Sequence, residues 1–313
     1  MKKVLIVLLA AVITALCFSV TACEEEIPPV EEVIENMVKA NADVKSYEME
    51  MDADMKLVMD LPEEDMSMGM PSDMNVKMTG TGAYDNTNKE LRMEMDMDIA
   101  APGEDPVKMA MAMYMVDGWM YMMMDMPMMS PQWMKQDMSD YGYFEQMQSA
   151  AFTEMQMEMI TEVYSSEDAV ITGIEKINGV RCYVLEMKLD MAKMIEYITR
   201  NPDFLTQTMP ELSDGEDIPD FADDEYREML DIFEKMFDDF TVTSWVAKDT
   251  YYIMKSYLEL HIDIDPQKMG IEDEEGSVVM DITGNSLMFN YDKSVSIVLP
   301  PEADNAVEGF MGY

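Results

Sequence analysis

The feature that most constrains the fold is a strict alternation of apolar and charged residues that begins at residue 48. The odd positions of this segment are apolar: Met49, Met51, Ala53, Met55, Leu57 and Met59. The even positions up to 56 are charged: Glu48, Glu50, Asp52, Asp54 and Lys56. Successive side chains of a β-strand point to opposite faces. Residues 48–60 therefore predict a strand with one apolar face and one solvated face.

The same alternation recurs along the chain and predicts a strand-rich fold. Further strands are expected at 76–84, 91–99, 107–115, 119–124, 169–177, 180–189, 240–248, 251–264, 277–283, 286–291 and 294–299. Asp117-Gly118 and Asn178-Gly179 are two-residue hairpin signals, because both central residues of a type I′ turn need a positive φ. Asp249-Thr250 and Gly284-Asn285 lie between two further pairs of predicted strands.

Helical spacing of apolar residues appears in a few segments only. It predicts an amphipathic helix over 29–44, helical inserts at 143–164 and 223–239, and a short helix over 190–199 capped by Asp190. Loops rich in proline and acidic residues are expected at 61–73, 101–106, 125–140 and 201–222. Many hairpin-linked strands with few helices predict one α+β domain around a large antiparallel sheet.

The N-terminus predicts export. Lys2 and Lys3 precede an apolar run from Val4 to Val20, as in a secretory signal, although such a run is also at the lower limit for a retained membrane span. The following Val20-Thr21-Ala22-Cys23 resembles a bacterial lipobox. The resemblance implies removal of residues 1–22 and a diacylglyceryl group on Cys23; an ordinary secreted protein is the alternative.

In the lipobox interpretation, two acyl chains give stable anchoring. Residues 23–29 then form a tether and residues 30–313 a single domain on the outer face of the cytoplasmic membrane, in the cell envelope.

Charge and composition exclude several classes of function. The formal charge of −43 would repel phosphate backbones, so no nucleic-acid partner is expected. His261 is the only histidine, so a His-based catalytic triad would have to use it, and no nucleophile motif accompanies it. Cys17 lies in the predicted signal segment and Cys23 is the predicted lipid site, so Cys182 remains alone and no disulfide is expected within the domain. No phosphate loop or complete metal motif is present. We therefore expect a non-enzymatic protein without a cofactor.

The order of elements resembles the LolA/LppX-like family of bacterial lipoproteins. The resemblance rests on Lys45-Ser46-Tyr47 before the first strand, the Tyr114–Tyr121 hairpin, the Trp245–Thr250 turn, and Leu299-Pro300-Pro301-Glu302-Ala303. It implies a curved half-barrel whose concave side is covered by helices, with an apolar cavity that binds acyl chains or lipoprotein lipids. Methionine in place of most Leu, Ile and Val, and the long acidic segment 201–222, depart from the family pattern.

The 42 methionines leave three interpretations open. Methionine could simply replace aliphatic residues in a core, or it could line an adaptable cavity for a hydrophobic ligand, since its side chain is flexible and polarizable. It could also bind a soft metal such as Cu(I). The cavity interpretation predicts a lining of Met93, Met95, Met109, Met111, Met113, Trp119, Tyr121, Tyr183, Leu185, Met187 and Trp245. The copper interpretation favours Met66, Met68, Met70, Met122, Met124 and Met126.

We expect a lipid-anchored protein that binds or carries a lipid or acyl chain. A copper-binding or other cation-binding surface protein, or a structural lipoprotein that binds a partner, remains the alternative. The sequence does not identify a protein partner.

Overall fold

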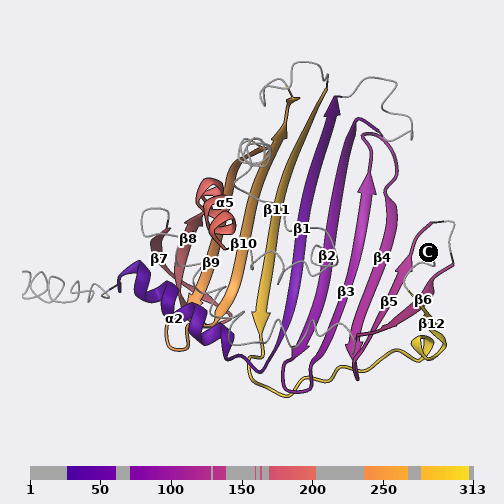
Figure 1. Cartoon of the computed structure of the whole chain (residues 1–313), viewed down its shortest axis with the longest axis horizontal. Helices are drawn as coiled ribbons and strands as arrows, with labels where there is room; N and C mark the ends of the chain where they lie inside the picture. The colour runs from indigo at the N-terminus through magenta and orange to yellow at the C-terminus, as the bar shows by residue number, and fades with distance from the viewer. Residues whose placement is uncertain are drawn as a thin grey trace, which may run out of the picture.

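The computed structural model describes residues 27–60, 71–127, 130–138, 159, 163, 169–201, 236–266 and 276–309. Within these residues, twelve strands form one open, curved sheet (Figure 1) in the order β12-β6-β5-β4-β3-β2-β1-β11-β10-β9-β8-β7. All neighbouring strands are antiparallel except the short β12, which runs parallel to β6. This architecture confirms the predicted fold class, a large curved antiparallel half-barrel with few helices.

The strands differ greatly in length, and the longest lie at the centre of the sheet. Their bounds are β1 Ser46–Asp60, β2 Asp73–Asp85, β3 Glu90–Ala100, β4 Val107–Val116, β5 Trp119–Asp125, β6 Gln132–Asp137, β7 Ala169–Ile177, β8 Val180–Lys188, β9 Phe237–Ala247, β10 Ile253–Ile264, β11 Ser277–Phe289 and β12 Val307–Glu308.

The strand register sorts the side chains onto two contrasting faces. Residues directly opposite each other on antiparallel strands lie on the same face. One such row runs through Leu185, Ser244, Ser256, Ser286, Met51, Gly80, Met95, Met111 and Met124. We call this side the methionine face. The opposite side carries Glu50, Asp52, Glu94 and Asp96 on the central strands, and we call it the acidic face.

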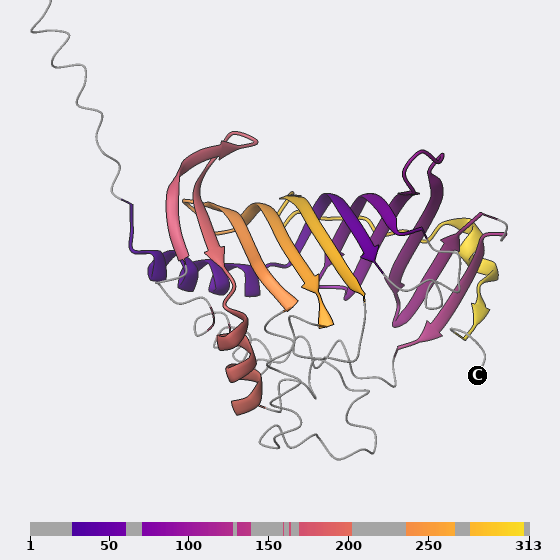
Figure 2. The same ribbon diagram turned by 90° about the horizontal axis from the view of Figure 1, so that it is seen from above.

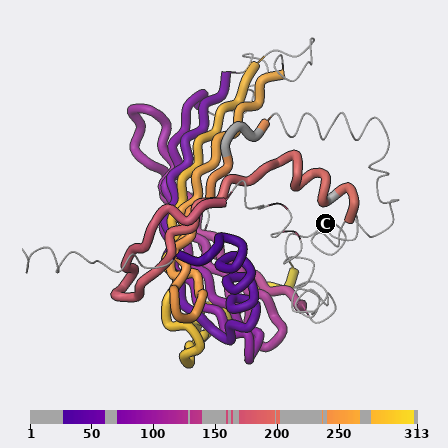
Figure 3. Tube along the Cα trace, turned by 90° about the vertical axis from the view of Figure 1, so that its left-hand side faces the viewer, coloured from indigo at the N-terminus to yellow at the C-terminus, as the bar shows by residue number. Residues whose placement is uncertain are grey.

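Two helices of the described residues, α2 (Val30–Ala42) and α5 (Met191–Arg200), lie on the methionine face, which is the concave side (Figures 2 and 3). The amphipathic α2 buries Val33, Ile34 and Met37. These pack with Leu185 and Val246 in the largest buried cluster. At the start of α5, Asp190 Oδ1 accepts a hydrogen bond from the Lys193 backbone N–H at 3.1 Å, as predicted for a capping residue.

The acidic face is covered at both ends by apolar clusters. At one end, Cys182, Ala247 and Met254 are buried together with half-buried aromatic side chains. At the other end, the C-terminal segment crosses the strands in extended form (Figure 2) and packs Ile297 against Ala83 and Ala112. The 3₁₀ helix η2 (Pro301–Asn305) follows and leads into β12. Between the two clusters the acidic face is open.

The predicted hairpin turns are confirmed. Asp117 and Gly118 adopt φ values of 53° and 80°, and Asn178 and Gly179 adopt 50° and 85°. Both pairs therefore have the left-handed backbone that a two-residue type I′ hairpin requires. The turns join β4 to β5 and β7 to β8.

Three predictions for individual segments were wrong. Gly284-Asn285 is the interior of the single strand β11, because β1 and β10 pair with it continuously on both sides. Residues 294–299 are extended but form no strand, because they pack through side chains onto the sheet face instead of joining its edge. The expected loop 125–140 contains β6, which pairs with β5.

The structure describes only a small part of the two predicted helical inserts. Phe237–Asp239 belong to β9, so the helix expected over 223–239 does not extend to its predicted end. Most of 143–164 and 223–236 lies outside the described residues, as do 1–26, 61–70 and 202–222. The predicted signal segment and Cys23 are therefore outside them too.

Candidate functional site

The methionine face is the most unusual surface of the molecule. Because most methionines of the first six strands occupy positions of the same parity, and because these strands pair in register, the side chains gather on one face. They are Met49, Met51, Met55, Met59, Met74, Met78, Met93, Met95, Met97, Met109, Met111, Met113, Met115, Met120, Met122, Met124 and Met134. Of these, Met115 alone is buried, at 6% exposure, and the rest are half-buried.

Two glycines of β2 make room for methionine side chains on this face. A Cβ placed on Gly82 would lie 2.5 Å from Met49 Cε and 2.9 Å from Met49 Cγ. A Cβ on Gly80 would lie 3.0 Å from Met95 Cγ and 3.1 Å from Met51 Cγ. The methionine side chains of β1 and β3 therefore lie across the β2 backbone and form a continuous thioether surface.

Eight of the residues predicted to line a cavity share the methionine face, but in two groups. Met93, Met95, Met109, Met111 and Met113 lie together on β3 and β4, where they are half-buried. The other three, Tyr183, Leu185 and Met187, lie on β8 and are buried against α2. Helix packing already fills the space over the second group, so only the first group presents accessible apolar surface.

Three predicted lining residues lie on the acidic face, because they have the opposite parity in their strands. Trp119 pairs with Val116 and Tyr121 with Tyr114, whereas the neighbouring Met120 pairs with Met115. Trp245 pairs with Lys255, whose Nζ lies 4.4 Å from the centre of the indole ring. The Trp245 Nε1–H also donates to Glu175 Oε2 at 2.8 Å. These aromatic side chains are therefore separated by the sheet from the methionines.

The structure describes three of the six methionines of the copper interpretation. Met122 and Met124 lie on the methionine face of β5, and Met126 follows the end of that strand. Met66, Met68 and Met70 lie outside the described residues. One cross-strand row carries four methionines, Met93, Met113, Met122 and Met134, on four adjacent strands. In the described part of the chain, no group of three His, Cys, Asp or Glu side chains could hold a metal ion.

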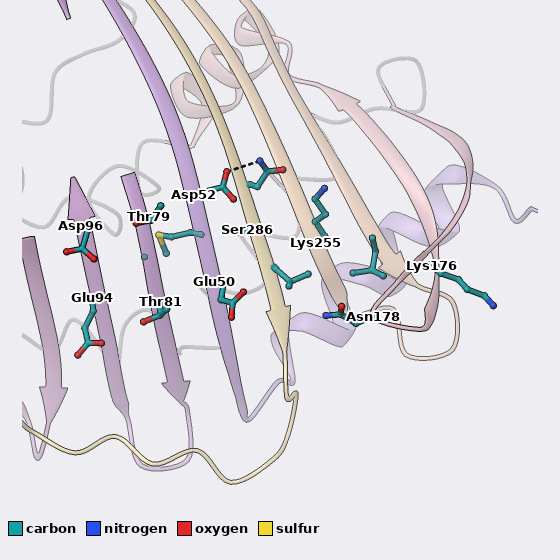
Figure 4. A pocket seen from close by; sticks show the side chains of 15 residues that line it. Glu50, Asp52, Thr79, Thr81, Glu94, Asp96, Lys176, Asn178, Lys255 and Ser286 are labelled. Atoms are coloured by element: carbon teal, nitrogen blue, oxygen red, sulfur yellow. Dashed lines mark hydrogen bonds between the residues drawn. The ribbon is translucent and has the colours of Figure 1, made fainter. Parts of the chain in front are cut away.

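The acidic face contains a polar hollow of about 940 Å³ that sequence reasoning did not anticipate (Figure 4). Its floor is formed by β10, β11, β1, β2 and β3, and one side by the turn of the β7–β8 hairpin. Figure 4 shows side chains from these elements around the hollow, including Glu50, Asp52, Thr79, Thr81, Glu94, Asp96, Lys176, Asn178 and Lys255. Asn285 Nδ2 donates to Asp52 Oδ2 at 3.0 Å.

This hollow is suited to polar ligands rather than to an acyl chain, because carboxylates, hydroxyls and amides form most of its wall. Alternation in β1 and β3 predicts its carboxylates, which occupy the solvated positions of those strands. No local signal could have predicted that the end of the β7–β8 hairpin, at Lys176–Asn178, lies beside them, because this contact joins segments at least 80 residues apart in the chain.

Tyr114 and Cys182 are among the titratable groups with shifted pKa values. Burial, and then the hydrogen bond to Glu94, raises the pKa of Tyr114 to about 12; the phenol donates to Glu94 Oε1 at 2.5 Å. Burial also raises the pKa of the Cys182 thiol, which is fully buried. Tyr114 therefore stays a neutral donor, and Cys182 stays a protonated thiol in a packed cluster.

No helix among the described residues combines the length and the apolar character needed to cross a membrane.

Within the described residues, the sheet carries a half-buried apolar surface, the methionine face. The chain belongs to a family of unknown function, DUF6612, whose model matches residues 29–308. A comparison with curated proteins found no match.

Similar solved structures include three that cover most of this chain at low identity. LprF from Mycobacterium bovis has 11% identity and a TM-score of 0.36, over 88% of this chain and 98% of its own. Lipoprotein LppX from Mycobacterium tuberculosis has 9% identity and a TM-score of 0.31, over 87% and 100%. A DUF1329 family protein from Desulfovibrio piger has 12% identity and a TM-score of 0.23, over 86% and 96%.

Proposed function

We propose that this protein is a lipid-anchored, non-enzymatic lipoprotein that binds the acyl chain of a lipid against its methionine face. The single observation that carries the proposal is the half-buried apolar surface that runs without a break across β1 to β6. Soluble proteins rarely leave large contiguous apolar surfaces accessible, and such surfaces commonly bind a ligand or partner.

Methionine suits this task better than branched aliphatic residues do. Its unbranched, polarizable side chain adjusts to irregular shapes, so it can pack against a flexible chain in several positions. The glycines Gly80 and Gly82 leave space into which Met49, Met51 and Met95 extend. A surface of this kind favours a class of ligand, long hydrocarbon, over one particular molecule.

Simple magnitudes indicate the size of ligand. Each buried CH₂ group contributes about 0.8 kcal/mol, whereas association costs about 4–15 kcal/mol in lost freedom of motion. A chain of about six CH₂ groups gives about 5 kcal/mol, near the lower limit of this cost, whereas about sixteen groups give about 13 kcal/mol, near its upper limit. We therefore propose a long-chain lipid as the ligand.

Membrane anchoring through Cys23 would place this face next to a source of such lipids. The support is the order of Lys2, Lys3, the apolar run and the small residues before Cys23. A tether of seven residues reaches no more than about 25 Å, so the domain would stay close to the outer face of the cytoplasmic membrane. Replacing Cys23 with Ser in the full chain should release the protein from the membrane fraction after cell lysis.

The binding proposal is tested by native mass spectrometry of residues 24–313 mixed with a neutral long-chain monoacylglycerol. We expect a bound lipid for the unmodified chain and a strong reduction for the double variant Met111→Gln/Met113→Gln, which keeps side-chain size but adds polar groups. Thr79→Gln/Thr81→Gln introduces the same two residues on the acidic face and should bind like the unmodified chain. Equal binding by both variants would contradict the proposal.

Cu(I) binding is a second candidate function, favoured by the cross-strand row of Met93, Met113, Met122 and Met134. Thioether sulfur is a soft ligand that prefers Cu(I). The same experiment discriminates: stoichiometric uptake of Cu(I) under reducing conditions, lost in Met113→Gln/Met122→Gln, together with no lipid adduct, would favour the metal site.

A further inference from the structure

The sulfur atoms of the described residues fall into two groups that differ in access to solvent. Met109, Met111 and Met113 on β4 are half-buried, whereas Met115, at the end of the same strand, is 6% exposed. Met37 and Met187, which lie under or within α2, are each 5% exposed. The strand β4 thus carries accessible thioethers and a protected thioether on one face.

Cysteine offers no competing site of oxidation among the described residues. Cys182 is fully buried between Ala247 and Met254. The reactive form of cysteine is the thiolate, and burial in an apolar cluster disfavours it. A small polar oxidant at the sheet therefore meets thioethers of the methionine face before any thiol.

We propose that the methionine face is a site of reversible oxidation, in which hydrogen peroxide converts the half-buried methionines of β1–β6 to sulfoxides and thereby switches off lipid binding. This inference rests on the proposed function for its second half only. In each reaction the sulfur lone pair attacks one peroxide oxygen, the O–O bond breaks, an S–O bond forms and water leaves. Sulfur is oxidised by two electrons and the peroxide is reduced by two.

The sulfoxide oxygens would lie on the surface that contacts the lipid, and this position determines their effect on binding. A sulfoxide is polar and a strong hydrogen-bond acceptor, so it needs water or a donor as a partner. A hydrocarbon chain laid over the face supplies neither, and leaving such a group unsatisfied under the ligand is unfavourable. Water outcompetes the chain, and the lipid dissociates. Reduction of the sulfoxides by methionine sulfoxide reductases restores the apolar surface.

The chemical half of the proposal is tested by peptide mapping of residues 24–313 after a timed exposure to hydrogen peroxide. We expect Met111 and Met113 to gain oxygen at least about tenfold faster than Met115 and Met187, in line with the access-dependence of oxidation. Because the compared methionines of β4 lie in one peptide, differences in digestion and recovery do not affect the ratio of their oxidation rates. Equal rates at Met113 and Met115 in the folded protein would overturn the proposal.

The binding half is tested with the same native assay and a matched pair of variants. Leucine has a similar volume and cannot form a sulfoxide, so Met93→Leu/Met95→Leu/Met111→Leu/Met113→Leu should retain more lipid binding after peroxide than the unmodified chain does. Met37→Leu/Met187→Leu/Met254→Leu removes protected sulfurs, and this control should lose binding as the unmodified chain does. Circular dichroism before and after peroxide establishes that each sample remains folded.

The outcomes separate the two proposals. Loss of binding by at least about tenfold on oxidation, with recovery after reductase treatment, is the expected result. Binding that survives full sulfoxidation of the face in a folded sample would overturn the switch but leave lipid binding intact. Absence of lipid from the reduced protein would remove the proposed function, and the switch with it, while the oxidation pattern would still test the modification site.

Discussion

The two ends of the methionine face are built from one continuous sheet but differ in composition and packing. At the end made by β8 and β9, Leu185 and Val246 are fully buried beneath α2. At the end made by β3 to β5, the equivalent positions carry methionine and are half-buried. Leu185 belongs to the same cross-strand row as Met95, Met111 and Met124, so the difference comes from the packing over each end and not from strand geometry.

This contrast bears on the role of methionine enrichment. If methionine merely replaced aliphatic residues in a core, it would dominate where the packing is tightest. The buried cluster under α2 instead consists mainly of Val33, Ile34, Leu185 and Val246, with Met37 and Met187 among them. Methionine is concentrated where the surface remains accessible, and this placement favours a binding role over a purely structural one.

The largest expected effect concerns stability at the covered end. Leu185→Ala removes a fully buried side chain and leaves a cavity, so we expect it to lower the free energy of unfolding by about 3 kcal/mol. Met111→Ala, on the same face at the open end, should cost less than about 1 kcal/mol because its side chain is only half-buried. Urea unfolding measures the free energy of unfolding of both variants. Equal losses would contradict the difference in packing between the two ends.

The next effect concerns how the open end is stabilised from the opposite side of the sheet. Ile297 is 8% exposed and packs against Ala83, Ala112 and Tyr114 behind the methionine strands. Ile297→Ala should therefore lower the free energy of unfolding by about 2 kcal/mol. The adjacent Val298 is 71% exposed, so Val298→Ala should change it by less than about 0.5 kcal/mol. If the thermal unfolding curves of the two variants coincide, the C-terminal segment does not support the sheet.

A smaller effect tests whether methionines lie across the β2 backbone. In Gly82→Ala the new methyl group meets Met49, whose flexible side chain can shift, so we expect a cost of about 1 kcal/mol. Gly173 has open space around its Cβ position and no positive φ, so Gly173→Ala should be neutral or slightly stabilising. A Gly82→Ala variant as stable as Gly173→Ala would mean that Met49 lies elsewhere.

The smallest effect depends on pH and concerns the start of the C-terminal segment. Asp292 accepts hydrogen bonds from the Tyr252 hydroxyl at 2.6 Å and the Lys45 backbone N–H at 2.8 Å. The first of these, then the second, lowers the pKa of its carboxyl in the folded state. The ionised group therefore stabilises the fold above its unfolded pKa of about 3.9, and this contribution is lost as the pH falls through the folded value.

Asp292→Asn should accordingly destabilise the protein at pH 7 by less than about 1 kcal/mol, because the site is exposed. The difference between the two proteins should stay constant from pH 7 to about pH 5 and shrink below about pH 4. Urea unfolding across this range provides the measurement. A difference that grows on acidification would reverse the assigned sign.

The sequence predicted those parts of the fold that local patterns alone determine. Alternation from residue 48 located β1, and Asn178-Gly179 located a hairpin, because each depends on residues close in the chain. Gly284-Asn285 resembled a turn but lies within β11, since two neighbouring strands supply pairing that no local pattern reports. The segment 294–299 alternates like a strand, yet it crosses the acidic face and packs there through Ile297.

The candidate site was predictable to the same extent. Strand parity placed Met93, Met95, Met109, Met111 and Met113 on one face, and the register confirms that they lie together. Trp119, Tyr121 and Trp245 were grouped with them for their aromatic character, although their parity assigns them to the acidic face. The polar hollow depends on the position of the β7–β8 hairpin, which is a tertiary property.

Photo-crosslinking tests the central claim most directly. A long-chain fatty acid with a diazirine near its methyl end would be bound to residues 24–313, irradiated, and located by peptide mapping. We predict crosslinks at the methionine-face positions of β3 to β5, such as Met95, Met111 and Met113, and competition by unlabelled lipid. Crosslinks concentrated around Thr79 and Thr81 on the acidic face, or no more labelling than in denatured protein, would contradict the account.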